Sequence, residues 1–160
     1  MLAWLDAECT DHLTLRIAAS SAGIRIVAFH PAAALPGDPS PSHPLLAEAV
    51  RQLRAYFAGA LRQFTLPLDL HGTPFQLRVW RELETIPFGE FRTYSDVAQA
   101  IGAPKAVRAV GAANGANPVA IVVPCHRVIG SSGKLVGYGG GLPLKKKLLT
   151  LESCNLPLFQ

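Results

Sequence analysis

The chain changes character near residue 70, and this change constrains its fold more than any other feature. Before it, residues 13–19 and 23–29 alternate or run apolar around a small polar turn, which predicts a β-hairpin. Residues 44–58 then carry apolar side chains at helical spacing, so a helix should pack on that hairpin, and residues 64–70 favour one more strand. We therefore predict an α+β protein with two domains, residues 1–70 and 71–160.

The second domain should consist mainly of short helices. Thr73 is a suitable N-cap for a helix over residues 74–86. Residues 93–102 predict a short helix that stops at Gly102, and residues 105–113 predict another. Two short helices joined by a glycine-containing turn are the pattern of a helix-turn-helix.

A thiol stands beside an imidazole later in the same domain. The apolar run 119–123 predicts a short buried strand that Pro124 ends, so Cys125 should lie at a strand exit with His126 and Arg127 directly after it. A free cysteine titrates near pH ~8.5 and needs a base or a cation to react at neutral pH. A lone Cys-His pair is more often a small core residue beside surface groups. Here the surroundings favour a presented nucleophile, because the glycine-rich segment 130–141 can line or close a pocket.

Charge is distributed unevenly along the chain. Residues 1–70 hold five Lys/Arg against six Asp/Glu, whereas residues 71–160 hold ten against five. A basic second half suggests a polyanionic partner, most simply nucleic acid, although a run such as residues 145–147 is also compatible with a solvated helix face. The three cysteines have no close pairing, and no long apolar run or leader is apparent. We expect a reducing, cytoplasmic location and no membrane association.

The order and spacing of these motifs resemble the O6-alkylguanine-DNA alkyltransferase family, in its stand-alone repair form. The resemblance rests on Asn117-Pro118, the hexapeptide 124–129, the glycine-rich stretch 137–142 and Glu152, and it is strong over residues 71–160 and weak before them. It implies a ribonuclease H-like first domain and a winged-helix-like second domain. It also implies direct-reversal DNA repair, in which the alkyl group of a flipped O6-alkylguanine, and of O4-alkylthymine, moves irreversibly to Cys125.

The same resemblance implies roles for individual residues. Cys125 is the alkyl acceptor, His126 deprotonates it through a water held by Asn117, and Glu152 orients His126. Arg108 fills the space that the flipped nucleotide leaves, and Tyr94 helps to rotate that nucleotide. The expected substrate pocket comprises Tyr94, Tyr138, Val128, Ser131 and Gly140, and the expected DNA-contacting residues are Arg108, Lys105, Ala106, Ala109, Ala113 and Arg127.

Other interpretations of the sequence remain. A Cys-His-Glu hydrolase explains the thiol, imidazole and carboxylate but neither the helix-turn-helix nor the basic second half. A non-catalytic binder of alkylated DNA would lack the cysteine, which is present, and nothing indicates the paired half-sites of a transcription factor. We expect no cofactor and no metal, since only Cys9 and His12 have ligand-like spacing. The resemblance suggests a monomer that can cluster on double-stranded DNA.

Overall fold

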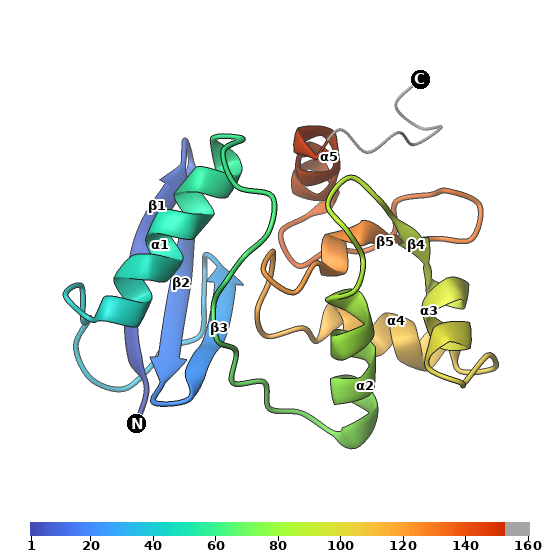
Figure 1. Cartoon of the computed structure of the whole chain (residues 1–160), viewed down its shortest axis with the longest axis horizontal. Coiled ribbons are helices and arrows are strands. Elements are labelled where there is room, and N and C mark those ends of the chain that lie inside the picture. The colour runs from blue at the N-terminus through green and yellow to red at the C-terminus, as the bar shows by residue number, and fades with distance from the viewer. Residues whose placement is uncertain (153–160) are drawn as a thin grey trace. The chain divides into compact units, whose positions relative to one another are not determined.

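The structure, a computed structural model, describes residues 1–152 and forms two compact units (Figure 1). The first comprises residues 1–71 together with residues 118–122, and the second comprises residues 72–117 and, of the described chain, residues 123–152. The segment 118–122, assigned to the second domain from the sequence, thus packs with the first unit in the structure. Each unit is described by itself below.

The first unit is a three-stranded antiparallel sheet with one helix on it. The strands β1 (Ala3–Thr10), β2 (Leu13–Ser20) and β3 (Gly23–Phe29) lie in the order β1-β2-β3, and α1 (Pro44–Phe57) runs along the sheet (Figure 1). The predicted hairpin, formed by β2 and β3, and the predicted helix are confirmed, whereas β1 was not predicted from the sequence. The core residues Leu15, Ile17, Leu46 and Leu53 are all fully buried. Burial of one face of each element holds the unit together.

Residues 64–70 do not form the predicted strand. Only Leu68 pairs with the sheet, as an isolated parallel bridge to Ile24, and the Pro67 carbonyl accepts the Ile24 N–H at 2.8 Å. Proline has no N–H to continue a ladder, and it divides this segment. The apolar residues here cover the edge of the sheet without extending it.

The apolar run 119–123 is also not a strand, so the prediction that Cys125 leaves a strand was wrong. Val119 makes one bridge to Val27, and the chain then turns at Ile121, whose φ of 72° lies in the left-handed region. A β-branched residue adopts this conformation only at a cost of about 1–3 kcal/mol. Ile121 is 1% exposed, so its buried side chain holds the turn in place.

The second unit is mainly helical, as predicted. Its helices are α2 (Pro74–Leu83), α3 (Tyr94–Ala100), α4 (Val107–Gly115) and α5 (Leu142–Leu151), with a 3-10 turn, η1, at Cys125–Arg127. Thr73 and Thr93 cap α2 and α3, and each forms a complete capping box with the side chain three residues later. In the part of the chain described, no helix is long and apolar enough to cross a membrane.

Two further contacts fix the helices around η1. The short strands β4 (Arg92–Thr93) and β5 (Val128–Ile129) pair in parallel, which joins the start of α3 to the residues directly after η1. The buried Trp80 of α2 donates its indole N–H to the carbonyl of Ala113 in α4 at 2.8 Å. A Cβ on Gly72 would lie 2.6 Å from the Trp80 ring, so only glycine leaves room for this indole.

The predicted helix-turn-helix corresponds to α3 and α4. Gly102 lies in the turn between them with φ of 76°, a conformation that glycine adopts without strain. The second helix begins at Val107, two residues later than predicted, so Lys105 precedes it and Ala106 is its N-cap. The pair α3 and α4 lies beside α2 within the same unit (Figure 1).

Candidate active site

Cys125 is held rigidly at the first position of η1. Its side chain is 6% exposed, and its N–H donates to the Val123 carbonyl at 2.8 Å. Two asparagines hold the same stretch: Asn114 in the last turn of α4 donates to the Cys125 carbonyl at 3.3 Å, and Asn117, just after the helix, donates to the Val123 carbonyl at 2.8 Å. The backbone on both sides of the thiol is therefore fixed by amide side chains.

The thiol is protonated at rest and needs a base. Burial raises the pKa of Cys125, while a hydrogen bond from Asn117, the positive charge of Lys145 and the backbone N–H groups of Cys125 and His126 act in the opposite direction. Because burial is the largest influence, these groups favour the thiolate without forming it unaided. A proton acceptor must complete the activation.

His126 can serve as that acceptor. The imidazole is fully buried, and its Nε2 lies 2.8 Å from Oε2 of Glu152, at the C-cap of α5. Glu152 has a pKa lowered to about 2 by hydrogen bonds from His126 and Arg127, which outweigh the effect of burial. A carboxylate can only accept a hydrogen bond, so Nε2 carries the proton. Nδ1 is then the basic atom, and it has no hydrogen-bond partner among residues 1–152.

Arg127 differs from its expected role as a DNA contact. Its side chain is 8% exposed, and its guanidinium donates to Glu152 from Nε at 2.8 Å and from Nη2 at 3.0 Å. A third bond runs from Nη1 to the Ile86 carbonyl at 2.6 Å. A cation buried in this way cannot meet a phosphate, so that prediction was wrong. The sequence shows a cation next to His126 but not which way it points.

Lys145 is a residue of the site that sequence reasoning missed. It lies on α5, is fully buried, and donates from Nζ to the Val128 carbonyl at 2.7 Å and the Val136 carbonyl at 2.9 Å. Burial lowers its pKa from 10.5 to about 8, and the Cys125 thiolate acts to raise it. Lys145 is the first of three consecutive lysines, and it differs from the other two in lying on the inner face of α5. The spacing of apolar residues along that helix was the sequence signal that could have placed Lys145 on the buried face.

This buried lysine should make stability depend on pH above neutrality. The folded-state pKa of about 8 is below the ordinary 10.5, so between these values the unfolded chain holds a proton that the folded chain has released. The free energy of unfolding should therefore rise with pH across this window, by up to about 3 kcal/mol from this group. Lys145→Met lacks the titrating amine, so its free energy of unfolding should not show this rise. We therefore expect the free energy of unfolding of wild type, relative to that of Lys145→Met, to increase between pH 7 and pH 10.5 when both are measured by urea denaturation. A constant difference would contradict the assignment.

The expected pocket residues occupy different environments. Tyr94 begins α3, with its ring 6.0 Å from Nζ of Lys145, and its pKa is raised by burial and by Cys125. Val128 is fully buried in β5, directly after η1. Ser131 is exposed, whereas Tyr138 and Gly140 are partly buried in the glycine-rich segment before α5. Tyr94 therefore lies near the thiol, Val128 directly follows η1, and the other three belong to the segment before α5.

The helix-turn-helix presents most of the expected DNA contacts. Lys105, Arg108 and Ala109 are exposed and Ala106 is partly exposed. Ala113 is 1% exposed because it lies on the inner face of α4 beside Trp80, so its prediction as a DNA contact was wrong. A helical position five residues after Arg108 points to the opposite face, which the alanine composition alone does not reveal.

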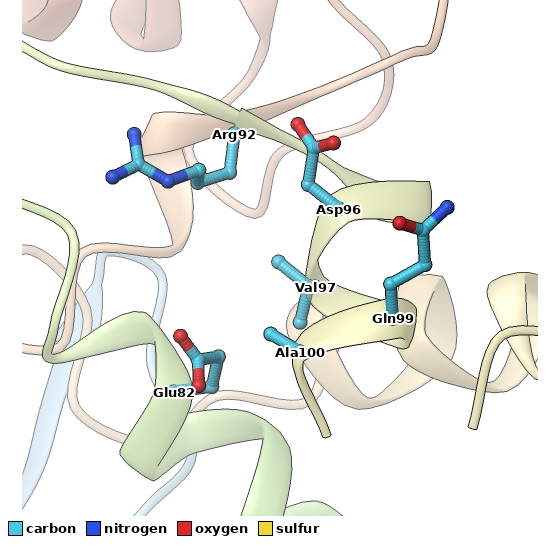
Figure 2. Close-up of a pocket in the computed structure, with 6 residues that line it drawn as sticks. All are labelled: Glu82, Arg92, Asp96, Val97, Gln99 and Ala100. Carbon is cyan, nitrogen blue, oxygen red and sulfur yellow. The ribbon is translucent and has the colours of Figure 1, made fainter. Parts of the chain in front are cut away.

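A surface hollow is lined by residues that do not include Cys125. Figure 2 shows it between α2, β4 and α3, and its lining residues are Glu82, Arg92, Asp96, Val97, Gln99 and Ala100. Asp96 already accepts the Thr93 N–H at 2.9 Å, and Glu82 accepts from Thr85 at 2.9 Å. No group of metal-ligating side chains occurs in residues 1–152.

A helix-turn-helix in the same unit as a buried thiol beside an imidazole–carboxylate pair is the arrangement expected of a protein that acts on DNA with a cysteine nucleophile. Comparison with known families agrees with this class. Residues 74–154 match the DNA-binding domain of 6-O-methylguanine DNA methyltransferase, and residues 14–70 match its ribonuclease-like domain. The chain belongs to the 6-O-methylguanine DNA methyltransferase family.

Individual relatives support this assignment. The methylated-DNA--protein-cysteine methyltransferase of Mycolicibacterium paratuberculosis is 65% identical over 111 residues, which are 69% of this chain and 67% of that protein. A crystal structure of the Mycobacterium tuberculosis O6-methylguanine methyltransferase matches over 100% of both chains with 46% identity and a TM-score of 0.86. The M. tuberculosis protein OGT in complex with DNA matches over 94% of this chain and 91% of that one, with 48% identity and a TM-score of 0.84. The mixed fold predicted from the sequence is confirmed.

Proposed function

We propose that this protein repairs DNA by taking an alkyl group from a modified base onto its own Cys125. The observation that carries the proposal is the buried Cys125 beside the His126–Glu152 pair, in which Nε2 lies 2.8 Å from the carboxylate. The family and its relatives supply the reaction class, methylated-DNA–protein-cysteine methyltransferase. Relatives are also known in complex with DNA, so DNA is the partner.

The chemistry is a displacement at carbon. The Cys125 sulfur forms a bond to the alkyl carbon, and the bond between that carbon and guanine O6 breaks with its electron pair going to O6. The thiol proton passes to Nδ1 of His126, and the guanine takes up one proton, so the products are an S-alkyl cysteine and unmodified guanine. A thioether does not hydrolyse, so each molecule reacts once. No cofactor enters the proton and electron balance.

Substrate access requires extrusion of the base. Guanine O6 lies inside a duplex, and a flipped nucleotide costs a few kcal/mol in lost pairing and stacking. The exposed Arg108 on α4 is suitably placed to replace the flipped nucleotide, and Tyr94 lies close enough to the thiol to guide it. Asn117, which hydrogen-bonds the thiol, is suited to hold the water of the proton relay. The lip of residues 130–141 would enclose the base.

The finer features of the function follow from the same proposal. The substrate is double-stranded DNA with O6-alkylguanine, and the protein acts as a monomer that can cluster on DNA. A thiol that must stay reduced fits a cytoplasmic location, and neither Cys9 nor Cys125 forms a disulfide.

Transfer of label is the direct test of this function. Duplex DNA with a single O6-methylguanine, radiolabelled in the methyl group, is mixed with a range of protein concentrations. We expect a rapid burst that ends at one methyl group per protein molecule, with the label on the peptide that contains Cys125. Continued turnover would indicate a hydrolase, and binding without transfer would indicate a lesion-binding protein. Either outcome would contradict the proposal.

A further inference from the structure

Two adjacent residues of η1 converge on one carboxylate. His126 reaches Oε2 of Glu152 at 2.8 Å, and Arg127 bonds both carboxylate oxygens, Oε1 at 2.8 Å and Oε2 at 3.0 Å. Oε2 is therefore shared by the imidazole and the guanidinium. The carboxylate side chain has no exposed surface, and these three hydrogen bonds contribute to its orientation.

We propose that Arg127 is a positioning residue of the alkyl-transfer reaction: its forked contact with Glu152 fixes the carboxylate that sets the proton-accepting form of His126. This inference rests on the proposed function and assigns to Arg127 a role through Glu152, not contact with DNA. It concerns the state of His126 before any substrate binds.

Geometry is the first part of the argument. A guanidinium that donates two parallel N–H groups to one carboxylate holds its plane, which a single ammonium cannot do. The Ile86 carbonyl accepts a third N–H at 2.6 Å, and the Phe88 ring centroid lies 5.9 Å from the guanidinium carbon. Arg127 is thus itself fixed by the segment that follows α2. The carboxylate it holds can direct only one oxygen to Nε2 of His126, which leaves Nδ1 as the acceptor.

Charge is the second part. Arg127 and Glu152 together carry no net charge, so the imidazole beside them gains little by becoming positive. Burial is the largest influence lowering the pKa of His126, the Glu152 contact opposes it, and the positive charges of Arg127 and Lys145 reinforce it. The charged groups that act on His126 are Lys145 on α5, Glu152 at its C-cap and Arg127 in η1. Without Arg127, a lone carboxylate would face the imidazole and favour its protonated form, which cannot accept the thiol proton.

Two substitutions separate geometry from charge. Arg127→Met removes both the positive charge and the paired hydrogen bonds to Glu152. Arg127→Lys keeps the positive charge but cannot donate two parallel hydrogen bonds to the carboxylate. Arg92→Met is the matched control, because Arg92 also pairs with a glutamate in the same unit, Glu90 at 3.2 Å, but lies at the surface. Thermal unfolding of each variant establishes which of them are folded at the assay temperature.

The readouts are ¹⁵N chemical shifts of the His126 imidazole against pH, and the rate of Cys125 alkylation by free O6-benzylguanine against pH. In wild type and Arg92→Met we expect a neutral imidazole at pH 7 with the proton on Nε2. In Arg127→Met the imidazole should be protonated at pH 7, and alkylation should be at least about tenfold slower there, with recovery at higher pH. In Arg127→Lys the imidazole should be neutral but distributed between its two tautomers, with an intermediate rate.

The ¹⁵N spectra test the role of Arg127 even if the protein does not carry out the proposed alkyl transfer. If either folded Arg127 variant shows the wild-type tautomer, titration and pH profile, Arg127 only stabilises the fold and the inference is overturned. Should Arg127→Met fail to fold, the tautomer ratio in Arg127→Lys decides alone. Absence of benzylation in wild type would overturn the proposed function, whereas the ¹⁵N spectra would still decide the role of Arg127.

Discussion

Cys125→Ala should abolish transfer of the methyl group to the protein while leaving its affinity for duplex DNA unchanged. Alanine has no nucleophilic atom, and the reaction has no route around the sulfur. We expect DNA binding to depend instead on the exposed face of the helix-turn-helix, which is formed by α3 and α4. Label incorporation from O6-methylguanine DNA and gel-shift titration on the same duplex measure the two properties separately.

Cys9→Ala is the matched control for this experiment. Cys9 is a second buried cysteine, in β1, and burial raises its pKa to about 11. Such a thiol is inert at neutral pH, so this variant should incorporate label as wild type does. Label in Cys125→Ala would assign the acceptor role to another residue, and peptide mapping would identify it.

Arg108→Ala should slow repair of duplex DNA by roughly ten- to a hundredfold, while its reaction with free O6-benzylguanine stays close to the wild-type rate. A free base needs no flipping, whereas a duplex base costs a few kcal/mol to extrude, and about 1.4 kcal/mol corresponds to a factor of ten. Arg108 is exposed in the first turn of α4, where a long cation can enter the base stack. Single-turnover rates on the two substrates give the ratio.

Lys105→Ala separates flipping from general attraction to DNA. Lys105 is exposed just before α4, so its loss should weaken DNA binding and lower the salt dependence by about one phosphate contact. At saturating DNA its repair rate should remain near that of wild type. Equal losses of Arg108→Ala on duplex and free base, or equal behaviour of the two variants, would remove Arg108 from the flipping step.

Local signals predicted much of the fold. Thr73 and Thr93 cap the helices that follow them, because a short side chain satisfies backbone N–H groups within its own turn. The hairpin of β2 and β3 and the helix α1 follow from apolar periodicity, which depends only on residues close in sequence. Whether an apolar segment becomes a strand depends on pairing with residues distant in the sequence. For residues 64–70 and 119–123 the apolar pattern was compatible with a strand, but the structure forms only isolated bridges there.

The candidate site divides in the same way. The sequence motif predicted Cys125 and His126, the family resemblance added Glu152, and the structure joins the last two at 2.8 Å. The motif order did not predict that Arg127 turns inward to Glu152, or that Lys145 is buried and donates to the Val136 carbonyl.

By itself, the sequence determined which chemical groups this protein has and which short helices and strands hold them, since propensities, caps and turns act over a few residues. Only the tertiary structure decided the direction in which each charge points and its protonation. These depend on burial and on partners distant in the chain: 25 residues separate Arg127 from the carboxylate that it holds. A desolvated charge must find such a partner or change its pKa, and no local pattern encodes where that partner lies.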